Sequence, residues 1–434
     1  MSGEKVISAK DFHKHPGWFN TLNAVWGMGY TRGSYPFFVK DDLMMAARRS
    51  SGLSDFGKDF WDEPLEQLLL SLNHEAMLHP IGAFITRKRI INLLSVRLRA
   101  QYWFRKHPEI LEQELYPPLV IVGLQRTGTT KLHRLLSADP DNRVLKSWEA
   151  INPAPLHRDM NGKDRRIRAA RTSEKALRKM APGFFAIHPV EYSAPEEDIL
   201  LLDVTFLSTT PEAITHVPSY AEWLEGTDQS YAYEYGSRLL KFLQWQNPGK
   251  RWILKSPHHL EFMDLIEKYY GDPTFLWTHR EISECIPSFL SMVSHSRALF
   301  SNSVRLEDVA AHWTKKTTYM LEKGLAYRRK GRNEEKFRDI LYERLVARSM
   351  GELERIYDGL GGIPETLASR FEEAEKENPK GKYGIHEYSA GQFGLSAEEL
   401  RNRNPEYTEL YTALKNGLVT ANNGKNGKDQ AGRI

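Results

Sequence analysis

The sequence predicts an α/β protein, with a central, mostly parallel sheet between two helical layers and an all-helical region before it. Short apolar runs bounded by turn residues recur after residue 117, and helical repeats separate them. Before residue 116 the apolar residues recur at helical spacing only. Strands that alternate with helices indicate a parallel sheet, because parallel neighbours need a long crossover connection between them.

The helical region is expected to span residues 1–115. Pro64 begins a run in which leucines recur at helical spacing, and residues 90–98 repeat this pattern on one face. An aromatic-rich segment extends from Trp18 to Phe38. It serves either as packing between helices, which the ordinary burial of such residues favours, or as a lid or acceptor pocket.

The α/β domain is expected to span residues 116–400. We expect strands at 119–122, 252–254, 274–277 and 337–342, because each is a short run of apolar or alternating residues. Helical repeats are centred near residues 132–136, 239–243, 286–293 and 353–360. Residues 401–434 form a C-terminal extension, and its polar tail from about residue 420 is expected to be disordered.

The composition is that of a globular protein without strong charge. Of the 434 residues 41% are hydrophobic and 27% are charged, and the net charge is +4. This balance does not predict nucleic-acid binding, and the basic segment 161–179 is interpreted as a solvated helix face. Cys285 is the only cysteine, which excludes a disulfide within the chain and a cysteine-built zinc site. A reducing compartment is therefore expected.

The chain contains no run of 18 apolar residues that would predict a transmembrane helix. Its first ten residues are polar and lack the apolar core of a signal peptide. We therefore expect a cytoplasmic protein without an integral membrane segment. Both a monomer and a homo-oligomer remain open.

The first predicted strand leads directly into a glycine-bounded loop, Gly123-Leu124-Gln125-Arg126-Thr127-Gly128-Thr129-Thr130, and then into a helix. Such a junction surrounds an anion with backbone N–H groups and the helix dipole. The glycine spacing is that of a P-loop and predicts a P-loop-like fold, but Thr129 replaces the lysine of a nucleoside triphosphatase. Arg126 supplies a cation, and the threonine hydroxyls supply donors. A simple strand–turn–helix connection without a ligand is the alternative.

A second cation follows the third predicted strand, which ends in Thr278-His279-Arg280. Many P-loop enzymes carry an aspartate for Mg²⁺ at such a place. Arg280 suits a second phosphate better than a metal ion, and Ser288 follows in the next helix. The sequence therefore predicts two separate anion sites and no metal site.

Three further segments follow in order, at residues 252–257, 341–346 and 379–383. Together with the loop and Arg280, these motifs over residues 117–395 resemble the sulfotransferase superfamily, which uses 3′-phosphoadenosine 5′-phosphosulfate. The loop is most similar to that of long bacterial-type members and the tyrosylprotein branch, where arginine replaces lysine. The resemblance implies transfer of a sulfuryl group from this nucleotide to a hydroxyl, with no metal. The glutamate after Arg280 departs from the family, and Pro257 stands where cytosolic members carry a histidine base.

The resemblance also implies site residues. For the nucleotide they are Arg126, Thr127, Gly128, Thr129 and Thr130 at the 5′-phosphosulfate, Arg280 and Ser288 at the 3′-phosphate, Tyr342 at the adenine, and Lys380, Gly381 and Lys382 in a loop closing over the 3′-phosphate. Lys255 corresponds to the catalytic lysine. Glu149 is the expected general base, and His258 is the second candidate.

Several questions stay open at this level. The acidic segment with Glu191, Glu196 and Glu197 either recognises a cationic acceptor or is simply solvated, and we expect the second. The acceptor is expected to be a small-molecule or lipid-like alcohol, because the first 115 residues are rich in leucine and aromatic side chains. The alternatives to a sulfotransferase are an ATP-dependent kinase on the same scaffold and a non-catalytic nucleotide-binding protein.

Overall fold

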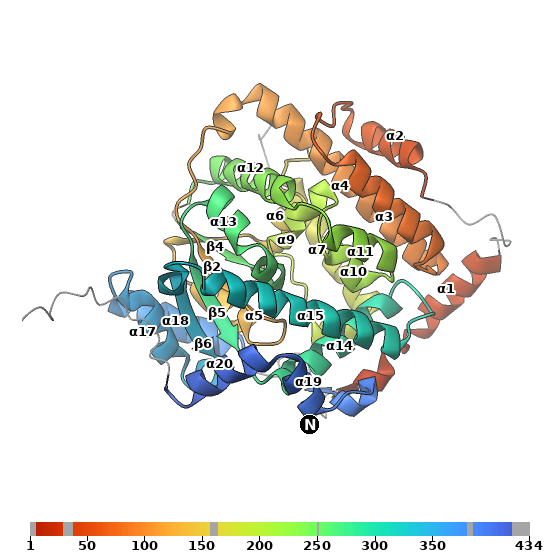
Figure 1. The fold of residues 1–434 in the computed structure, drawn as a ribbon. Helices are drawn as coiled ribbons and strands as arrows, with labels where there is room; N and C mark the ends of the chain where they lie inside the picture. Colours follow the sequence, from red (N-terminus) through yellow and green to blue (C-terminus); the bar gives the residue numbers. More distant parts are fainter. Residues whose placement is uncertain (1–5, 29–37, 157–163, 250, 380–384, 419–434) are drawn as a thin grey trace, which may run out of the picture.

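The computed structural model describes residues 6–28, 38–156, 164–249, 251–379 and 385–418. Its centre is a parallel sheet with the strand order β3-β4-β2-β5-β6 (Figure 1). The bounds are Asn142–Val144 for β3, Arg251–Lys255 for β4, Leu119–Val122 for β2, Thr274–His279 for β5 and Phe337–Leu341 for β6. The predicted α/β fold with a central parallel sheet is therefore confirmed.

The four predicted strands are all present, and the sequence missed three short ones. The central sheet gains β3, whose first two residues, Asn142 and Arg143, are polar and gave no apolar run. Two further strands, β1 (Val6–Ser8) and β7 (Ile385–Glu387), pair in parallel, so the start of the described chain lies beside residues 385–387. Each missed strand has three residues, too few to show a periodicity.

Helices make up most of the remaining chain. The first region holds α1 (Gly17–Met28), α2 (Lys40–Ser51), α3 (Asp62–His74) and α4 (Pro80–Lys106). Between β2 and β4 lie α5 (Thr129–Leu136), α6 (Ser147–Ile151), α7 (Arg165–Met180), α8 (Pro182–Ile187), α9 (Ile199–Leu202), α10 (Thr210–Ile214), α11 (Pro218–Glu225) and α12 (Ser230–Gln246). After β4 come α13 (Met263–Tyr270), α14 (Ile282–Ala298), α15 (Leu306–Arg328), α16 (Tyr342–Ala347), α17 (Ser349–Asp358), α18 (Glu365–Glu377), α19 (Ala397–Arg403) and α20 (Pro405–Lys415).

Alternating strand residues divide the core between the two faces of the sheet. Leu119 and Ile121 of β2 join a cluster built with α5, α17 and α18. Val120 and Val122 point the other way, into a larger cluster shared with α4, α12, α13 and α15. The helices α2, α3 and α4 contribute to this same larger cluster and lie on the side of α12 that is away from the sheet (Figure 1). The sheet is therefore buried on both faces, as its continuous apolar strands require.

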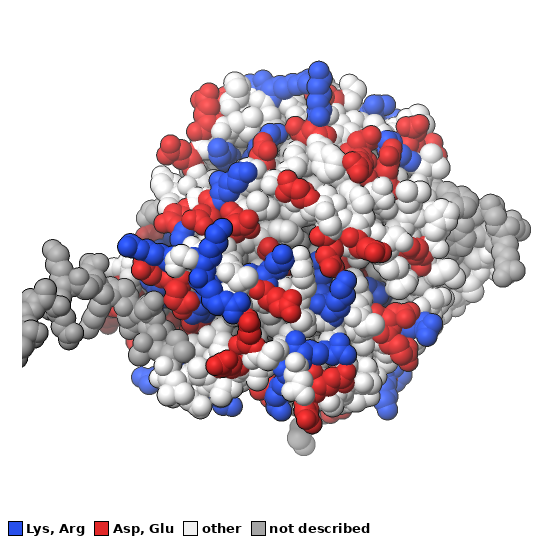
Figure 2. Space-filling model, in the orientation of Figure 1, with Lys and Arg blue, Asp and Glu red and all other residues white. Residues whose placement is uncertain are grey.

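The surface carries both signs of charge. On the face drawn in Figure 2, Lys and Arg side chains alternate with Asp and Glu side chains, and no large patch of one sign covers this face. The basic helix α7 is mostly solvent-exposed, as the sequence predicted. Among the described helices, none combines the length and the apolar composition needed to cross a bilayer.

Candidate functional site

Three strands bring the predicted site residues to one edge of the sheet. Parallel strands end at the same edge, so the segments that follow β2, β4 and β5 leave the sheet side by side. These segments carry the glycine-bounded loop 123–128, Lys255 and Arg280. Since β2 lies between β4 and β5, the loop lies between the lysine and the second arginine.

The loop has a backbone that few residue types adopt. Gly123 has a φ of 126°, and a Cβ there would lie 2.5 Å from the carbonyl oxygen of Thr278. Arg126 has a φ of 71°, which is a strained conformation for a side chain of its size. Gly128 follows with a φ of 94° and is the N-cap of α5. Such alternation of backbone conformation turns successive N–H groups to one side, where they suit an anion.

The hydroxyl of Thr127 does not have the expected role of a donor to an anion. It is buried and lies 2.6 Å from both the Leu124 carbonyl oxygen and the Thr278 Oγ1. The side chain therefore ties the loop to the end of β5 and is not a free donor for an anion. Thr129 is buried at the first turn of α5, whereas Thr130 is exposed.

The two predicted anion sites adjoin, contrary to the expectation that they are separate. The Arg126 Nε donates to the Ser288 Oγ at 3.1 Å, and the Arg280 Nη1 donates to the Arg126 carbonyl oxygen at 3.0 Å. The reason is the strand order, because β2 and β5 are direct neighbours. Burial, together with the charge of Arg280, lowers the pKa of Arg126. The positive charge of Arg280 disfavours the charged form of Arg126, and an anion bound beside both side chains would offset this effect.

Tyr342 lies against both the loop and Arg280. The Arg280 Cζ is 4.3 Å from the centre of the Tyr342 ring, which is the distance of a cation–π contact. The same ring closes the space above Gly128, where a Cβ would lie 3.1 Å from Tyr342 Cδ2. Tyr342 is therefore part of the site, at the start of α16. The predicted closing loop, Lys380, Gly381 and Lys382, lies outside the described residues.

Substitution of Gly128 by alanine tests whether this packing matters. We expect Gly128→Ala to lower the free energy of unfolding by about 1–3 kcal/mol, because the residue has a left-handed φ and lies against the Tyr342 ring. Chemical denaturation measures this loss. Gly183→Ala is the control, since a Cβ at Gly183 meets nothing within 4 Å. Equal stability of the two variants would contradict the expectation.

No motif in the sequence indicated Tyr407, which holds the backbone of Arg280 in place. The Tyr407 hydroxyl accepts from the Arg280 N–H and donates to the Arg280 carbonyl oxygen, both at 3.3 Å. Glu284 accepts from the Arg280 side chain at 2.9 and 3.1 Å. Tyr407 belongs to α20, so the C-terminal extension helps to build the site.

Lys255 is at the end of β4 with its side chain almost fully buried. Its Nζ donates to the Glu197 Oε1 at 2.7 Å, and its backbone N–H donates to the Asp198 Oδ1 at 2.9 Å. Asp198 also pairs with the His259 Nε2 at 2.8 Å, and the other ring nitrogen of His259 lies 2.9 Å from the Tyr233 hydroxyl. This chain of contacts fixes the segment before α9 against β4.

Contrary to the expectation from the sequence, the acidic segment is not simply solvated. Glu197 pairs with Lys255, and Glu196 is half-buried beside it. Burial raises the pKa of Glu196, although the charge of Lys255 opposes this. His188 lies near the pair formed by Glu197 and Lys255. Burial lowers its pKa to about 4, while Glu197 acts in the opposite direction and Lys255 in the same one. Three adjacent acids were the only sequence signal, and such runs are usually exposed.

The contacts of Glu149 argue against its predicted role as the general base. Its carboxylate accepts from Arg143 at 2.6 and 3.1 Å and from the backbone N–H of Lys146 at 3.0 Å. Both partners of this ion pair are buried. The Arg143 guanidinium also lies over the Trp252 ring. Glu149 therefore caps α6 and ties it to the edge of the sheet, which is a structural role that the sequence did not show.

His258 also has surroundings that do not suit the predicted role. Its ring is buried between Tyr233 and Phe262. Burial holds the pKa of His258 well below its ordinary value, and the charges that add to this effect are those of Lys316 and His259. None of these contacts leads to Lys255. His258 therefore lies in aromatic surroundings with a lowered pKa, which does not suit a general base.

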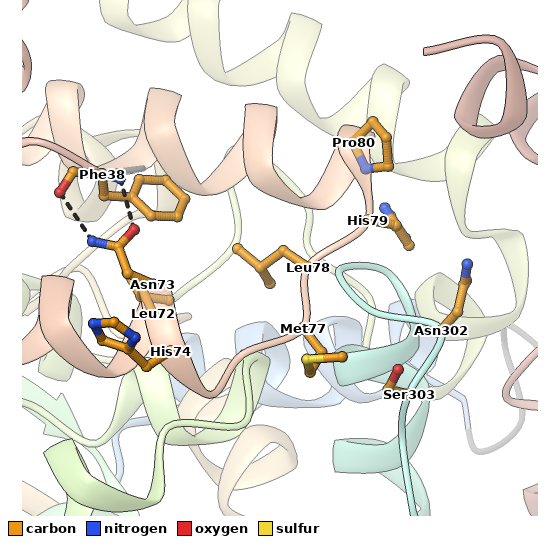
Figure 3. Close-up of a pocket in the computed structure, with 10 residues that line it drawn as sticks. All are labelled: Phe38, Leu72, Asn73, His74, Met77, Leu78, His79, Pro80, Asn302 and Ser303. Atoms are coloured by element: carbon orange, nitrogen blue, oxygen red, sulfur yellow. Dashed lines mark hydrogen bonds between the residues drawn. The ribbon is translucent and has the colours of Figure 1, made fainter. Parts of the chain in front are cut away.

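A cavity of about 490 Å³ lies elsewhere, between the end of α3 and the segment after α14 (Figure 3). Phe38, Leu72, Met77 and Leu78 give it apolar walls, and Asn302 and Ser303 close one side. Asn73 is held by hydrogen bonds with the Phe38 backbone. Neither arginine of the anion site lines this cavity, and neither does Lys255.

Comparison with known proteins shows a matching family model and similar solved structures. The model of the sulfotransferase family matches residues 117–364. The sulfotransferase STF1 from Mycobacterium tuberculosis H37Rv is similar in structure, with a TM-score of 0.75 and 29% identity over 85% of this chain and 99% of that one. The fold of the sulfotransferase STF9 from Mycobacterium avium is also similar, with a TM-score of 0.77 and 24% identity over 88% and 98%. No curated protein sequence matches the chain.

Proposed function

This chain belongs to the sulfotransferase family, and from that premise we propose that its donor is 3′-phosphoadenosine 5′-phosphosulfate and its acceptor a hydroxyl compound. One observation carries the proposal. Arg126, Arg280 and Lys255 follow three adjacent strands at the same edge of the sheet, around a loop whose backbone suits an anion. A nucleotide with phosphates at two positions needs such a set of neighbouring cations.

The residues present fit this nucleotide. The N–H groups at the start of α5 would bind the 5′-phosphosulfate, with Gly128 leaving the backbone free to approach it. Arg280 and Ser288 would bind the 3′-phosphate, and Arg126, which belongs to the loop and donates to Ser288, would bind the 5′-phosphosulfate. Tyr342 would contact the adenine. When bound, the donor supplies a sulfuryl group whose departure leaves negative charge on a phosphate oxygen.

Lys255 is the residue that we assign to this developing charge. Its ammonium group is fixed by burial and by Glu197, and fixed charges in a site with little water stabilise a transition state strongly. The loop N–H groups act together with it. The chemistry that these residues perform is electrostatic, since they bind and orient without forming a covalent bond.

The proposed acceptor is an apolar small-molecule or lipid-like alcohol. Support comes from the first region, where Trp18 and Trp26 of α1 and Phe84 of α4 are exposed. The cavity of Figure 3, which has both apolar and polar walls, lies in the same region of the chain. Transfer of ³⁵S from labelled donor to sterols, long-chain alcohols, phenols and sugars tests this class. Preference for the sugars would contradict it.

Isothermal titration tests the donor directly. We expect 3′-phosphoadenosine 5′-phosphate to bind in the presence of EDTA, because the site offers arginines for both phosphates. ATP with Mg²⁺ is the comparison, since a kinase would prefer it. Tight binding of ATP that requires Mg²⁺, without binding of the other nucleotide, would replace the proposal by the kinase alternative.

Arg280→Ala tests the 3′-phosphate site. We expect this variant to bind 3′-phosphoadenosine 5′-phosphate about 10- to 100-fold more weakly, because a charge-assisted hydrogen bond contributes roughly 1.5–3 kcal/mol. Affinity for adenosine 5′-phosphate, which lacks the 3′-phosphate, should change little. Arg329→Ala is the control, because Arg329 pairs with Glu406 on the surface. Equal losses for both nucleotides would contradict the assignment.

A further inference from the structure

We infer that Glu197 is the general base that takes the proton from the acceptor hydroxyl. This inference rests on the proposed function and names a residue for it. The carboxylate lies directly on the ammonium group of Lys255, at 2.7 Å, so the two groups act at the same place. A base must lie within hydrogen-bond reach of the attacking oxygen while the lysine lies within reach of the leaving oxygen.

The two oxygens of Glu197 are used differently. Oε1 accepts from Lys255, whereas Oε2 has no hydrogen-bond partner within the described part of the chain. The side chain is 25% exposed, while that of Lys255 is 5% exposed. Oε2 therefore faces the open side of the pair, where an acceptor hydroxyl can reach it. The carboxylate of Glu149, by contrast, is 5% exposed and accepts hydrogen bonds at both oxygens.

The segment that carries Glu197 is held rigidly. On one side, the backbone N–H of Glu196 donates to the Leu145 carbonyl oxygen at 2.8 Å, and Pro195 pairs with Lys146 in a short antiparallel bridge. On the other side, Asp198 is buried and accepts from the backbone of Lys255 and from His259. Glu197 lies between these two anchors, so its position relative to Lys255 is fixed by the fold.

Two neighbours compete for the same role. Glu196 is turned towards its own chain, since its Oε1 accepts from the backbone N–H of Glu197 at 3.0 Å. His188 lies within the electrostatic reach of Arg126, Arg134 and Lys255. These cations disfavour the imidazolium that a histidine base must form when it takes a proton.

The step balances without any oxidant or metal. The acceptor oxygen forms a bond to sulfur as the bond between sulfur and the bridging phosphate oxygen breaks. The acceptor proton passes to the Glu197 Oε2, and the electron pair of the broken bond stays on the phosphate oxygen, next to Lys255. The products are the sulfate ester, 3′-phosphoadenosine 5′-phosphate and one proton, which the carboxyl later releases to water.

The test compares Glu197→Gln, Glu196→Gln and Glu191→Gln with the wild-type protein. The third is the matched control, because Glu191 pairs with Arg134 in the same segment. Isothermal titration with 3′-phosphoadenosine 5′-phosphate measures the nucleotide site. Turnover is measured as ³⁵S released or transferred from labelled donor, with water and a panel of phenols and alcohols as acceptors. Thermal unfolding confirms that each variant is folded.

We expect Glu197→Gln to lower turnover by about 10²- to 10⁴-fold, with nucleotide affinity unchanged within about 3-fold. Glu196→Gln should lose far less, and Glu191→Gln should keep its turnover. A fourth variant, Glu197→Ala, leaves a space at the missing carboxylate. Formate should restore part of its turnover, since it can enter this space and accept the proton. This rescue is the result that a merely structural role would not produce.

Other outcomes overturn the inference in distinguishable ways. Full turnover in Glu197→Gln, or its loss in Glu196→Gln alone, would assign the base elsewhere and leave the proposed function intact. Loss of turnover without rescue by formate would make Glu197 a structural partner of Lys255. A wild-type protein that binds the nucleotide but transfers sulfur to no acceptor would overturn the catalytic assignment. A wild-type protein that does not bind the nucleotide would overturn the proposed function itself.

Discussion

Replacement of Lys255 by alanine will lower turnover by about 10²- to 10³-fold, which is the usual effect of removing one fixed group that stabilises developing negative charge. The side chain is buried at the end of β4 and is held by Glu197. The loop N–H groups and Arg280 remain, so affinity for 3′-phosphoadenosine 5′-phosphate should change far less than turnover. Release of ³⁵S-sulfate from labelled donor measures the first effect, and titration calorimetry measures the second.

Lys336→Ala is the matched control for this variant. Lys336 forms two ion pairs, with Glu267 and Asp272, but both lie at the surface and away from the site. Its removal should leave both turnover and nucleotide affinity unchanged. If Lys255→Ala kept its turnover, the charge on the leaving oxygen would have to be stabilised by the loop and the arginines alone.

Replacement of Asp339 by alanine will lower the free energy of unfolding by about 3–5 kcal/mol, the usual cost of leaving a buried partner charge unpaired. Asp339 of β6 accepts from Arg328 at 2.6 and 2.8 Å and lies 2.8 Å from the His279 Nε2 at the end of β5. All three side chains are buried. Because His279 precedes Arg280, nucleotide affinity should fall together with stability.

Glu334→Gln provides the comparison for Asp339. Glu334 binds the same arginine, but about half of its side chain is exposed, so its loss should cost at most about 1 kcal/mol. Urea denaturation of both variants measures the difference. Equal costs for the two variants would show that burial does not decide the strength of this network.

The Asp339 network also predicts a pH dependence. Burial by itself would raise the pKa of Asp339, but His279 and Arg328 outweigh it and hold that pKa far below the ordinary value of 3.8. A lowered pKa means that the contribution to stability is complete above the ordinary value and is lost as the pH falls towards the lowered one. The stability difference between wild type and Asp339→Asn should therefore shrink as the pH falls from 5 to 2.

Local patterns in the sequence predicted the parts of the fold that depend on near neighbours. The apolar runs predicted β2, β4, β5 and β6, because a buried parallel strand needs side chains that avoid water on both faces. The glycine-bounded loop predicted a strand–turn–helix junction at residues 119–130, since such a junction needs positive φ values and close approaches that favour glycine at 123 and 128. The order of these motifs predicted the family to which the chain belongs.

Tertiary structure alone decided which polar and charged groups contact one another. Glu197 contacts Lys255 across 58 residues of sequence, and Tyr407 contacts Arg280 across 127. Glu149, the base that the sequence favoured, instead forms an ion pair with Arg143, only six residues away. A carboxylate looks the same in sequence whether it is solvated, paired or free to take a proton. Its role depends on burial and on the partners that the strand order brings to it, and neither follows from local spacing.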